Sequence, residues 1–257
     1  MNYRNLTVIA IAFLFAIING CNTNLNNSRK NYLTQSEKEQ GWELLFDGNT
    51  FKGWRGLGMK SVQTYHWKIE HGIIREINND KSSVEANVKP VEGGDLMTIE
   101  TYDNFELYFE WKIGEGGNSG IKYNVSEEMS MKYGSKYSAL GFEYQILDDD
   151  NDRYKGKLKP SQYTASLYDM IAPANVNLNP VGQFNSSRII VKGNHGEHWL
   201  NGIKVLDYEF GTAEFDSLYQ HSKYYKYLNF EKKRKGHIVI TNHNENSWYR
   251  NIKIKKL

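Results

Sequence analysis

The chain has 257 residues, a formal net charge of +2 and 39% hydrophobic residues. That length is normal for one large domain. The small net charge, with acidic and basic residues interleaved, argues against nucleic acid as the main partner. The chain holds a single cysteine, so disulfides within it are excluded and its core must hold the fold unaided.

The N-terminal residues are typical of an export signal. Arg4 precedes an apolar stretch at 6–18 that is too short to span a bilayer comfortably. Ile-Asn-Gly then leads into Cys21, and this context resembles the lipobox of bacterial lipoproteins, in which the cysteine receives diacylglycerol. We expect residues 1–20 to be a lipoprotein signal peptide and Cys21 to be the lipid anchor. The chain would then contact the membrane through this lipid, in the cell envelope, facing the periplasm or the cell surface. An ordinary signal peptide with an incidental cysteine is the alternative.

The next segment is polar and rich in asparagine. Such a composition buries too little apolar surface to order itself, so we expect residues 21–39 to form a tether. Residues 40–257 would then form the folded domain.

Strand-like alternation continues to the end of the chain. In the segment 105–111, Phe105, Leu107, Phe109 and Trp111 fall on one face. Further strands are expected at 42–46, 66–77, 95–100, 119–125, 141–147, 187–193, 196–200, 203–209, 236–242 and 248–255. Asn201-Gly202 is a favoured two-residue hairpin turn, because both residues tolerate positive φ. This density of strands, with four prolines and little helical periodicity, predicts an all-β chain with a single antiparallel β-sandwich.

Three long segments show no strand pattern and are expected to be irregular: 126–140, 148–165 and 211–235. Long loops in a compact domain are often functional, so these segments are candidate walls of a site.

Several segments together resemble the 3-keto-disaccharide hydrolase family of concanavalin A-like jelly-roll sandwiches. The likeness runs in order over about residues 41–255. Its main pieces are the segments at 41–48, 53–56, 117–123, 143–149, 166–169, 193–195, 198–202, 236–243 and 250–254. The chain departs from the family pattern at Thr241-Asn242-His243-Asn244, where the family usually has Gln-Asp-His-Gly. It also departs after Asp149, where a His-Pro pair is often found.

The resemblance implies an enzyme that acts on a mono- or disaccharide glycoside already oxidised at C3. The implied reaction is 1,2-elimination of the aglycone, hydration of the resulting 3-keto-2-hydroxy-glucal, or both, with hydrolysis as the net result. This function comes from the resemblance and not from the strand pattern. No cofactor and no metal ligands are predicted, and a divalent metal that polarises the ketone is left open.

The expected strand 141–147 supplies the first candidate residues. Glu143 and Gln145 share one face, and Phe142, Tyr144 and Ile146 share the other. A carboxylate beside an amide suits proton abstraction next to a ketone better than double displacement, which needs two carboxylates. The alternatives are an ordinary solvent-facing strand, or a second carboxylate from another strand such as Glu110.

The other candidate residues surround this strand. Lys122 shares a face with Asn118 and could stabilise an enolate oxygen or act as a base, although a solvated lysine is as good an interpretation. His243 could titrate near working pH, and its place in the family pattern favours a catalytic role. We take Glu143, Lys122 and His243 as catalytic candidates. The substrate-binding candidates are Asn118, Gln145, Asp148 and Tyr168.

Two other functions remain open from the sequence. The altered Thr241-Asn242 segment favours a non-catalytic carbohydrate-binding lipoprotein on the same sandwich. A direct glycoside hydrolase is the third hypothesis.

Overall fold

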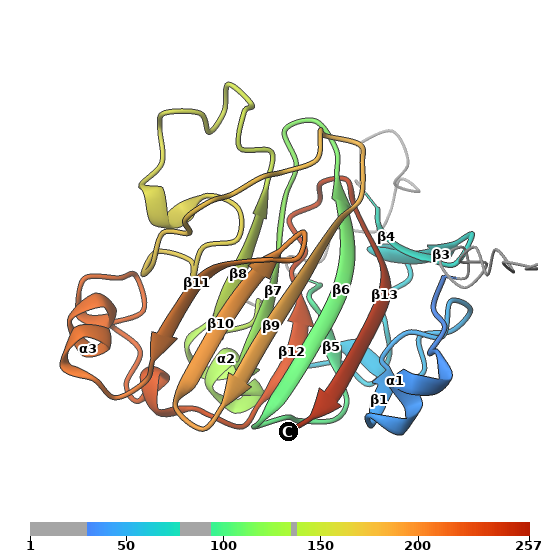
Figure 1. Cartoon of the computed structure of the whole chain (residues 1–257), viewed down its shortest axis with the longest axis horizontal. Helices are drawn as coiled ribbons and strands as arrows, with labels where there is room; N and C mark the ends of the chain where they lie inside the picture. Colours follow the sequence, from blue (N-terminus) through green and yellow to red (C-terminus); the bar gives the residue numbers. More distant parts are fainter. Residues whose placement is uncertain (1–29, 78–93, 135–137) are drawn as a thin grey trace, which may run out of the picture.

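Two antiparallel sheets form the fold in the computed structural model, which describes residues 30–77, 94–134 and 138–257 (Figure 1). The larger sheet has the order β11-β10-β9-β6-β13-β4-β3, and β1 pairs with β13. Its strands are β1 (Trp42–Leu44), β3 (Trp67–Glu70), β4 (Ile73–Glu76), β6 (Phe105–Ile113), β9 (Asn185–Lys192), β10 (His195–Leu200), β11 (Ile203–Glu209) and β13 (Ser247–Lys256).

The smaller sheet has the order β2-β5-β12-β7-β8. Its strands are β2 (Trp54–Gly56), β5 (Leu96–Thr98), β7 (Asn118–Val125), β8 (Phe142–Leu147) and β12 (His237–Ile240). The predicted antiparallel sandwich is confirmed, and so is the hairpin at Asn201-Gly202, where both residues have positive φ. The strand β2 was not expected from the sequence.

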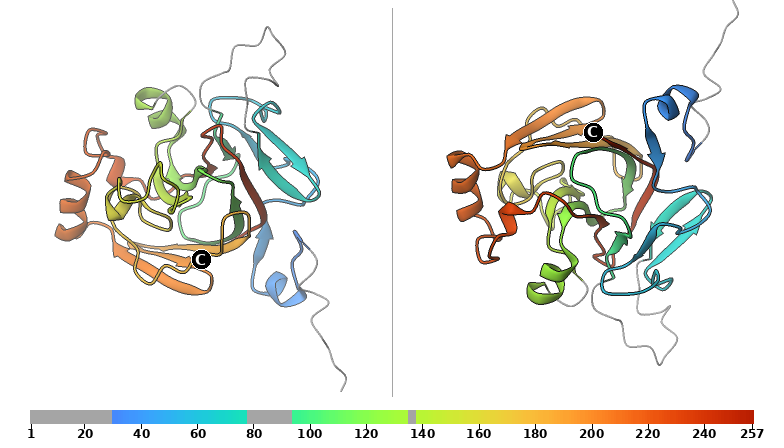
Figure 2. Two further views of the ribbon diagram at one scale, coloured as in Figure 1. Left: turned by 90° about the horizontal axis from the view of Figure 1, so that it is seen from above. Right: turned by 90° about the horizontal axis from the view of Figure 1, so that it is seen from below.

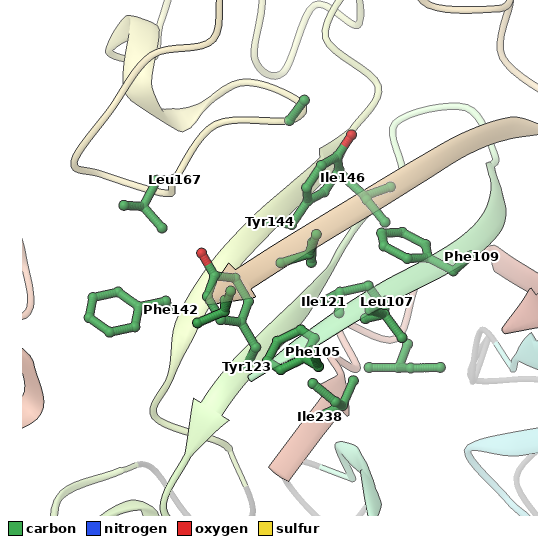
Figure 3. Close-up of a cluster of buried hydrophobic side chains, with 14 of the residues drawn as sticks. Phe105, Leu107, Phe109, Ile121, Tyr123, Phe142, Tyr144, Ile146, Leu167 and Ile238 are labelled. Atoms are coloured by element: carbon green, nitrogen blue, oxygen red, sulfur yellow. The ribbon is translucent and has the colours of Figure 1, made fainter. Parts of the chain in front are cut away.

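The core lies between the sheets and is rich in aromatic side chains (Figure 3). β6 buries the alternate residues that the sequence predicts, from Phe105 to Trp111, and β8 buries Phe142, Tyr144 and Ile146 against them. Phe109 and Tyr144 meet edge to face with their ring centroids 5.6 Å apart. Full burial of a large apolar side chain stabilises the fold by about 2–3 kcal/mol, so these two strands fix which face of β8 points outward.

A small polar network crosses this core. The Tyr123 hydroxyl lies 2.9 Å from His198 Nε2 and 2.6 Å from the Tyr208 hydroxyl, and His198 Nδ1 lies 3.0 Å from the Ala165 carbonyl oxygen. His198 is fully buried, and this burial lowers its pKa to about 4 against the opposing effect of its hydrogen bonds. The imidazole is therefore neutral and joins the larger sheet to β7 of the smaller one.

α-Helices occur in two of the three segments that were expected to be irregular, and that part of the prediction was wrong. α2 (Glu127–Tyr133) lies within 126–140, and α3 (Ala213–Gln220) lies within 211–235. Each begins at a side-chain cap, since Ser126 accepts from Met129 N and Thr212 accepts from Phe215 N. Short 3-10 helices span Pro160–Gln162 and Phe230–Lys232. Figure 2 shows α2 on the side of the smaller sheet that faces away from the larger sheet.

Residues 30–39 belong to the segment expected as a tether, and the structure shows them packed against the sandwich. They include α1 (Gln35–Glu39), which Thr34 and Glu37 close with a capping box. Asn31 N donates to Asn251 Oδ1, Asn251 N donates to Asn31 Oδ1, and Asn31 Nδ2 donates to the Gly72 carbonyl oxygen. Among the described residues, contacts with the rest of the domain are already made at residue 31. Cys21 and the expected signal peptide lie outside the described residues.

Candidate active site

The outer face of the smaller sheet carries the predicted polar residues. β7 and β8 pair so that Lys122 stands opposite Glu143 and Gly120 stands opposite Gln145. Because Phe142, Tyr144 and Ile146 fill the core, the strand alternation turns Glu143 and Gln145 outward. Gln145 Nε2 donates to Asn118 Oδ1 at 3.2 Å, which places both predicted amides beside each other on this face.

Glu143 lies in the floor of this face and is only 4% exposed. A Cβ atom at Gly120 would lie 2.6 Å from Glu143 Oε1, so the glycine leaves the room that the carboxylate occupies. The nearest cation in the salt-bridge geometry is Lys223, whose Nζ lies 3.9 Å from Glu143 Oε2. Glu143 is thus a largely buried carboxylate with an ammonium group close to it.

Lys223 was not predicted from the sequence. Its Nζ lies over the Tyr168 ring, 4.0 Å from the centroid, which joins the predicted Tyr168 to the Glu143 carboxylate. Partial burial lowers the pKa of Lys223, and the nearby Lys122 lowers it further, while Glu143 and Asp169 raise it. Burial and the nearby Glu143 carboxylate raise the pKa of Tyr168 to about 12, so its hydroxyl stays protonated and can donate a hydrogen bond.

His243 lies on the loop that follows β12. Thr241 N donates to the Gly120 carbonyl oxygen at 3.0 Å, so this loop leaves the sheet directly beside the Glu143 site. The imidazole is exposed, yet the surrounding protein still restricts its hydration and lowers its pKa. Glu143 raises this pKa and Lys122 lowers it, so the charges of the other two predicted catalytic residues act on His243.

The segment that carries Tyr168 is fastened to the free edge of β8. Ala165 N donates to the Gln145 carbonyl oxygen at 2.8 Å, and Tyr168 N donates to the Glu143 carbonyl oxygen at 3.0 Å. Ala165 and Asp169 both have positive φ, a conformation that costs a non-glycine residue free energy. The Asp169 side chain accepts from Gln162 Nε2 at 2.9 Å and from Lys223 N at 2.7 Å. One carboxylate thus holds the Tyr168 and Lys223 segments together.

The structure separates Asp148 from this group. Its Oδ2 accepts from Gly116 N at 2.8 Å, and the residue lines a cavity of about 390 Å³ together with Trp111 and Asn185 of the larger sheet. Asp148 follows the end of β8, where a turn breaks the strand alternation. Its closeness to the strand in the sequence therefore did not predict the side of the sheet on which it lies.

Glu110 also lies away from the site. It belongs to β6 of the larger sheet, where it accepts from Arg250 Nε at 2.6 Å and from Asn251 Nδ2 at 2.8 Å. It therefore cannot serve as the second carboxylate opposite Glu143. Within residues 30–77, 94–134 and 138–257, no group of three or more His, Cys, Asp or Glu side chains is arranged to hold a metal ion.

A cavity of about 530 Å³ lies at the edge of the sandwich, between β11 and α3. Its polar lining includes His195, whose Nδ1 lies 2.6 Å from Glu209 Oε1 and whose Nε2 lies 3.1 Å from Glu197 Oε1. These carboxylates raise the pKa of His195, chiefly through the hydrogen bond with Glu197, and they occupy both ring nitrogens. None of the residues predicted from the sequence lines this cavity, and we place the candidate active site at Glu143.

Comparison with known proteins gives the same site residues a family context. The sequence model of the 3-keto-alpha-glucoside-1,2-lyase-like domain matches residues 41–255. The chain is 37% identical over 235 aligned residues to the 3-keto-disaccharide hydrolase of Bacteroides thetaiotaomicron, and the alignment covers 84% of this chain and 79% of that protein.

Solved structures agree with this comparison. The crystal structure of a candidate glycosyl hydrolase from Parabacteroides distasonis is similar with a TM-score of 0.77 and 32% sequence identity, over 89% of this chain and 100% of that one. A second candidate glycosyl hydrolase of the same organism shares the fold, with a TM-score of 0.62 and 22% identity, over 84% of this chain and 99% of that one.

Proposed function

Because the chain belongs to the family of 3-keto-alpha-glucoside-1,2-lyase-like domains, we propose that it acts on glycosides oxidised at C3. It removes the aglycone by 1,2-elimination, hydrates the resulting 3-keto-2-hydroxy-glucal, or carries out both steps with net hydrolysis. The name of the Bacteroides relative, a 3-keto-disaccharide hydrolase, supports this substrate class. The observation that carries the proposal is the buried Glu143 carboxylate with Lys122, Lys223 and His243 around it.

The chemistry of the substrate explains why these groups suit it. A ketone at C3 acidifies the proton on C2, because the electrons of the broken C–H bond are delocalised onto the ketone oxygen as an enolate. The enolate then forms the C1–C2 double bond, and the C1–O bond breaks with its electron pair on the leaving aglycone. Such a reaction needs a base at C2, cations or donors at the enolate oxygen, and an acid at the leaving oxygen.

Each of these roles can be assigned to side chains of the candidate active site. Glu143 or His243 removes the C2 proton, since Glu143 lies on the outer face of the smaller sheet and His243 lies on the loop beside it. Lys122 and Lys223 hold the negative charge of the enolate, and Asn118 and Gln145 bind sugar hydroxyls. Tyr168 keeps its proton and donates a hydrogen bond to the substrate or to the leaving oxygen.

Direct glycoside hydrolysis fits this arrangement less well. It needs two carboxylates on either side of the scissile bond. The Asp169 carboxylate is engaged by Gln162 Nε2 and Lys223 N, and Glu110 belongs to the larger sheet. With Asp169 and Glu110 engaged by other groups, the Glu143 carboxylate beside Lys223 favours proton abstraction.

The test is to incubate the purified domain with a 3-keto-glucoside and with its unoxidised parent, and to analyse the products. We expect turnover of the oxidised substrate alone. The product should be the 3-keto-2-hydroxy-glucal, which has no hydrogen on C2, or the hydrated 3-keto sugar with solvent deuterium at C2. Release of the 3-keto sugar without deuterium at C2 would favour direct hydrolysis. Binding without any turnover would support a carbohydrate-binding protein.

Replacement of the candidate base tests its role. Glu143→Gln keeps the shape of the side chain and removes its charge, so we expect at least a hundredfold loss of kcat, in the range by which general acid–base groups accelerate reactions. The melting temperature should stay nearly unchanged. Glu110→Gln, a matched carboxylate-to-amide change on the other sheet, should leave kcat unaltered. Equal activity of the Glu143→Gln variant and the wild type would exclude Glu143 as the base.

We further propose that Cys21 is lipidated and anchors the chain in the cell envelope, with residues 1–20 as the signal peptide. The lipobox-like context supports this proposal. In the part of the chain that the structure describes, no helix is long and apolar enough to cross a membrane. The Cys21→Ser variant should stay unprocessed or partition into the aqueous phase of a detergent extraction. Unchanged processing and partitioning would contradict the proposal.

A further inference from the structure

We propose that Glu76 and Asp95, two carboxyl side chains buried behind the site, are positioning residues that hold His243 and Lys122 in place relative to Glu143. This inference rests on the proposed function for its meaning in catalysis. Neither residue lies on the open face, and neither was singled out by the sequence.

Glu76 anchors the loop that carries His243. It is the last residue of β4 and is fully buried. Its Oε1 accepts from His243 N at 2.7 Å and from Glu245 N at 3.2 Å, and Ser247 Oγ donates to its Oε2 at 2.6 Å. One side chain from the larger sheet therefore fixes the start, the middle and the end of the segment 243–247.

Asp95 connects that loop to Lys122. It is 2% exposed, and its Oδ1 accepts from Asn242 N at 2.9 Å while its Oδ2 accepts from Ala139 N at 2.7 Å. The Ala139 carbonyl oxygen in turn accepts from Lys122 Nζ at 3.0 Å. The same carboxylate thus holds the residue before His243 and the residue that receives the ammonium group of Lys122.

The hydrogen bonds to Glu76 and Asp95 fix the backbone from which the His243 imidazole projects. Among the described residues, the His243 ring has no hydrogen-bond partner, so its position depends on the backbone from which it projects. Asn242 N and His243 N are both bound by the two buried carboxyl groups. Burying carboxyl groups costs free energy that apolar side chains would avoid, which favours a role in specifying geometry.

Glu76 and Asp95 respond differently to replacement by the amide. Burial raises the pKa of Glu76 to about 8, although its hydrogen bonds oppose the change, so the neutral carboxyl predominates near pH 7. Glu76→Gln can keep these contacts, since the amide oxygen accepts both N–H groups and the Ser247 hydroxyl, which donates to Glu76 Oε2 in the structure, can turn to accept from the amide NH₂. Asp95→Asn has no such solution, because both partners of Asp95 are backbone N–H donors and the amide offers one oxygen.

Four variants test the proposal by steady-state kinetics on a 3-keto-glucoside. Glu76→Met keeps the volume and removes the acceptors, and we expect kcat to fall about tenfold to a hundredfold, as a misplacement on the order of 1 Å would cause, with little change in KM. The pH profile of kcat should change shape as well. Glu76→Gln should restore most of the activity, and Asp95→Asn should lose at least tenfold. Glu106→Gln, a buried carboxylate paired with Arg188 and Lys255 on the larger sheet, is the matched control and should behave as wild type.

A second readout does not depend on turnover. The NMR titration of the His243 ring should move to lower pH in Glu143→Gln, because Glu143 raises the pKa of His243. In the Glu76→Met background this effect of Glu143→Gln should be lost or much reduced. If the wild type fails to turn over any 3-keto-glycoside, the proposed function fails while this titration still decides whether Glu76 places His243.

Two results would overturn the proposal. One is a folded Glu76→Met variant with the wild-type kcat and pH profile. The other is a His243 titration that still responds fully to Glu143→Gln in the Glu76→Met background. If Glu76→Met does not fold, Ser247→Ala removes only one of the three donors and carries the same test with a smaller expected loss. Folding of every variant is checked by circular dichroism and thermal unfolding.

Discussion

Gly120 sets the space available to the Glu143 carboxylate. It lies in the extended backbone of β7, so its value is steric and not conformational. A Cβ atom there would lie 2.6 Å from Glu143 Oε1 and 3.1 Å from the Tyr144 carbonyl oxygen. The Glu143 side chain would have to move, since the backbone of β8 is held in the sheet.

We therefore expect Gly120→Ala to lower kcat on a 3-keto-glucoside by at least about tenfold, because the catalytic carboxylate is displaced. The stability cost should be about 1–3 kcal/mol, as for other overpacked sites. Gly156→Ala is the control: its φ of +70° strains the new side chain, but its Cβ meets nothing within 4 Å. The free energy of unfolding of that variant should fall by about 1 kcal/mol, and its activity should stay unchanged. Wild-type kinetics in Gly120→Ala would show that the carboxylate has room to spare.

At the residue scale, alternation alone predicted which side chains of β8 face outward. Phe142, Tyr144 and Ile146 had to be buried, so Glu143 and Gln145 could only lie on the other face. Lys223 was not predictable, because no periodic pattern ties residue 223 to any strand. The signal that could have found it was the length of the segment 211–235, which marked this stretch as a candidate wall.

At the scale of elements, the strands were predictable and the short helices were not. α2 and α3 have seven and eight residues, too few to show a clear helical period. Their caps, Ser126 and Thr212, were visible in the sequence, but single capping residues are common in loops as well. Tertiary contacts, not local pattern, decide whether such short segments become helical.

Residues 30–39 make several contacts with the sandwich. A protein that starts at residue 40 lacks the three hydrogen bonds of Asn31, the buried Leu33 and the ion pair of Glu37 with Lys253. Relative to a protein that starts at residue 30, we expect its free energy of unfolding to be lower by about 2–4 kcal/mol. Urea titrations of both proteins measure this difference.

The single variant Asn31→Ala provides the control for that truncation. It should account for about 1–2 kcal/mol of the loss, since it removes side-chain partners of Asn251 and Gly72 and leaves the rest of the segment in place. If the shorter protein were as stable as the longer one, residues 30–39 would act as a simple tether.

At the scale of the whole molecule, His198, which is buried where the two sheets meet, makes the free energy of unfolding depend on pH. The folded state holds His198 with a pKa of about 4, whereas an unfolded histidine has its ordinary value of 6.5. Between these values the unfolded chain binds more protons, so acidification favours unfolding. The neutral His198 makes its full contribution to the free energy of unfolding above pH 6.5. This contribution, up to about 3 kcal/mol, is lost as the pH falls toward 4.

We expect the difference in unfolding free energy between the wild type and His198→Phe to shrink as the pH falls from 7 to 4. Comparing the two proteins cancels other groups, such as Glu76 and Asp149, whose raised pKa values act in the opposite sense. Urea unfolding at a series of pH values gives the difference. A difference that stays constant with pH would mean that His198 has the same pKa in the folded and the unfolded protein.

The way residues 164–168 lie along β8 has a consequence for how the protein can evolve. β8 is the last strand of its sheet, and the N–H groups of Ala165 and Tyr168 bind carbonyl groups that would otherwise be exposed along its edge. An exposed edge invites pairing with another chain and aggregation. Insertions or deletions in this segment would therefore endanger solubility, so new substrate preferences should arise by exchange of outward side chains such as Tyr168, with the length of the segment kept.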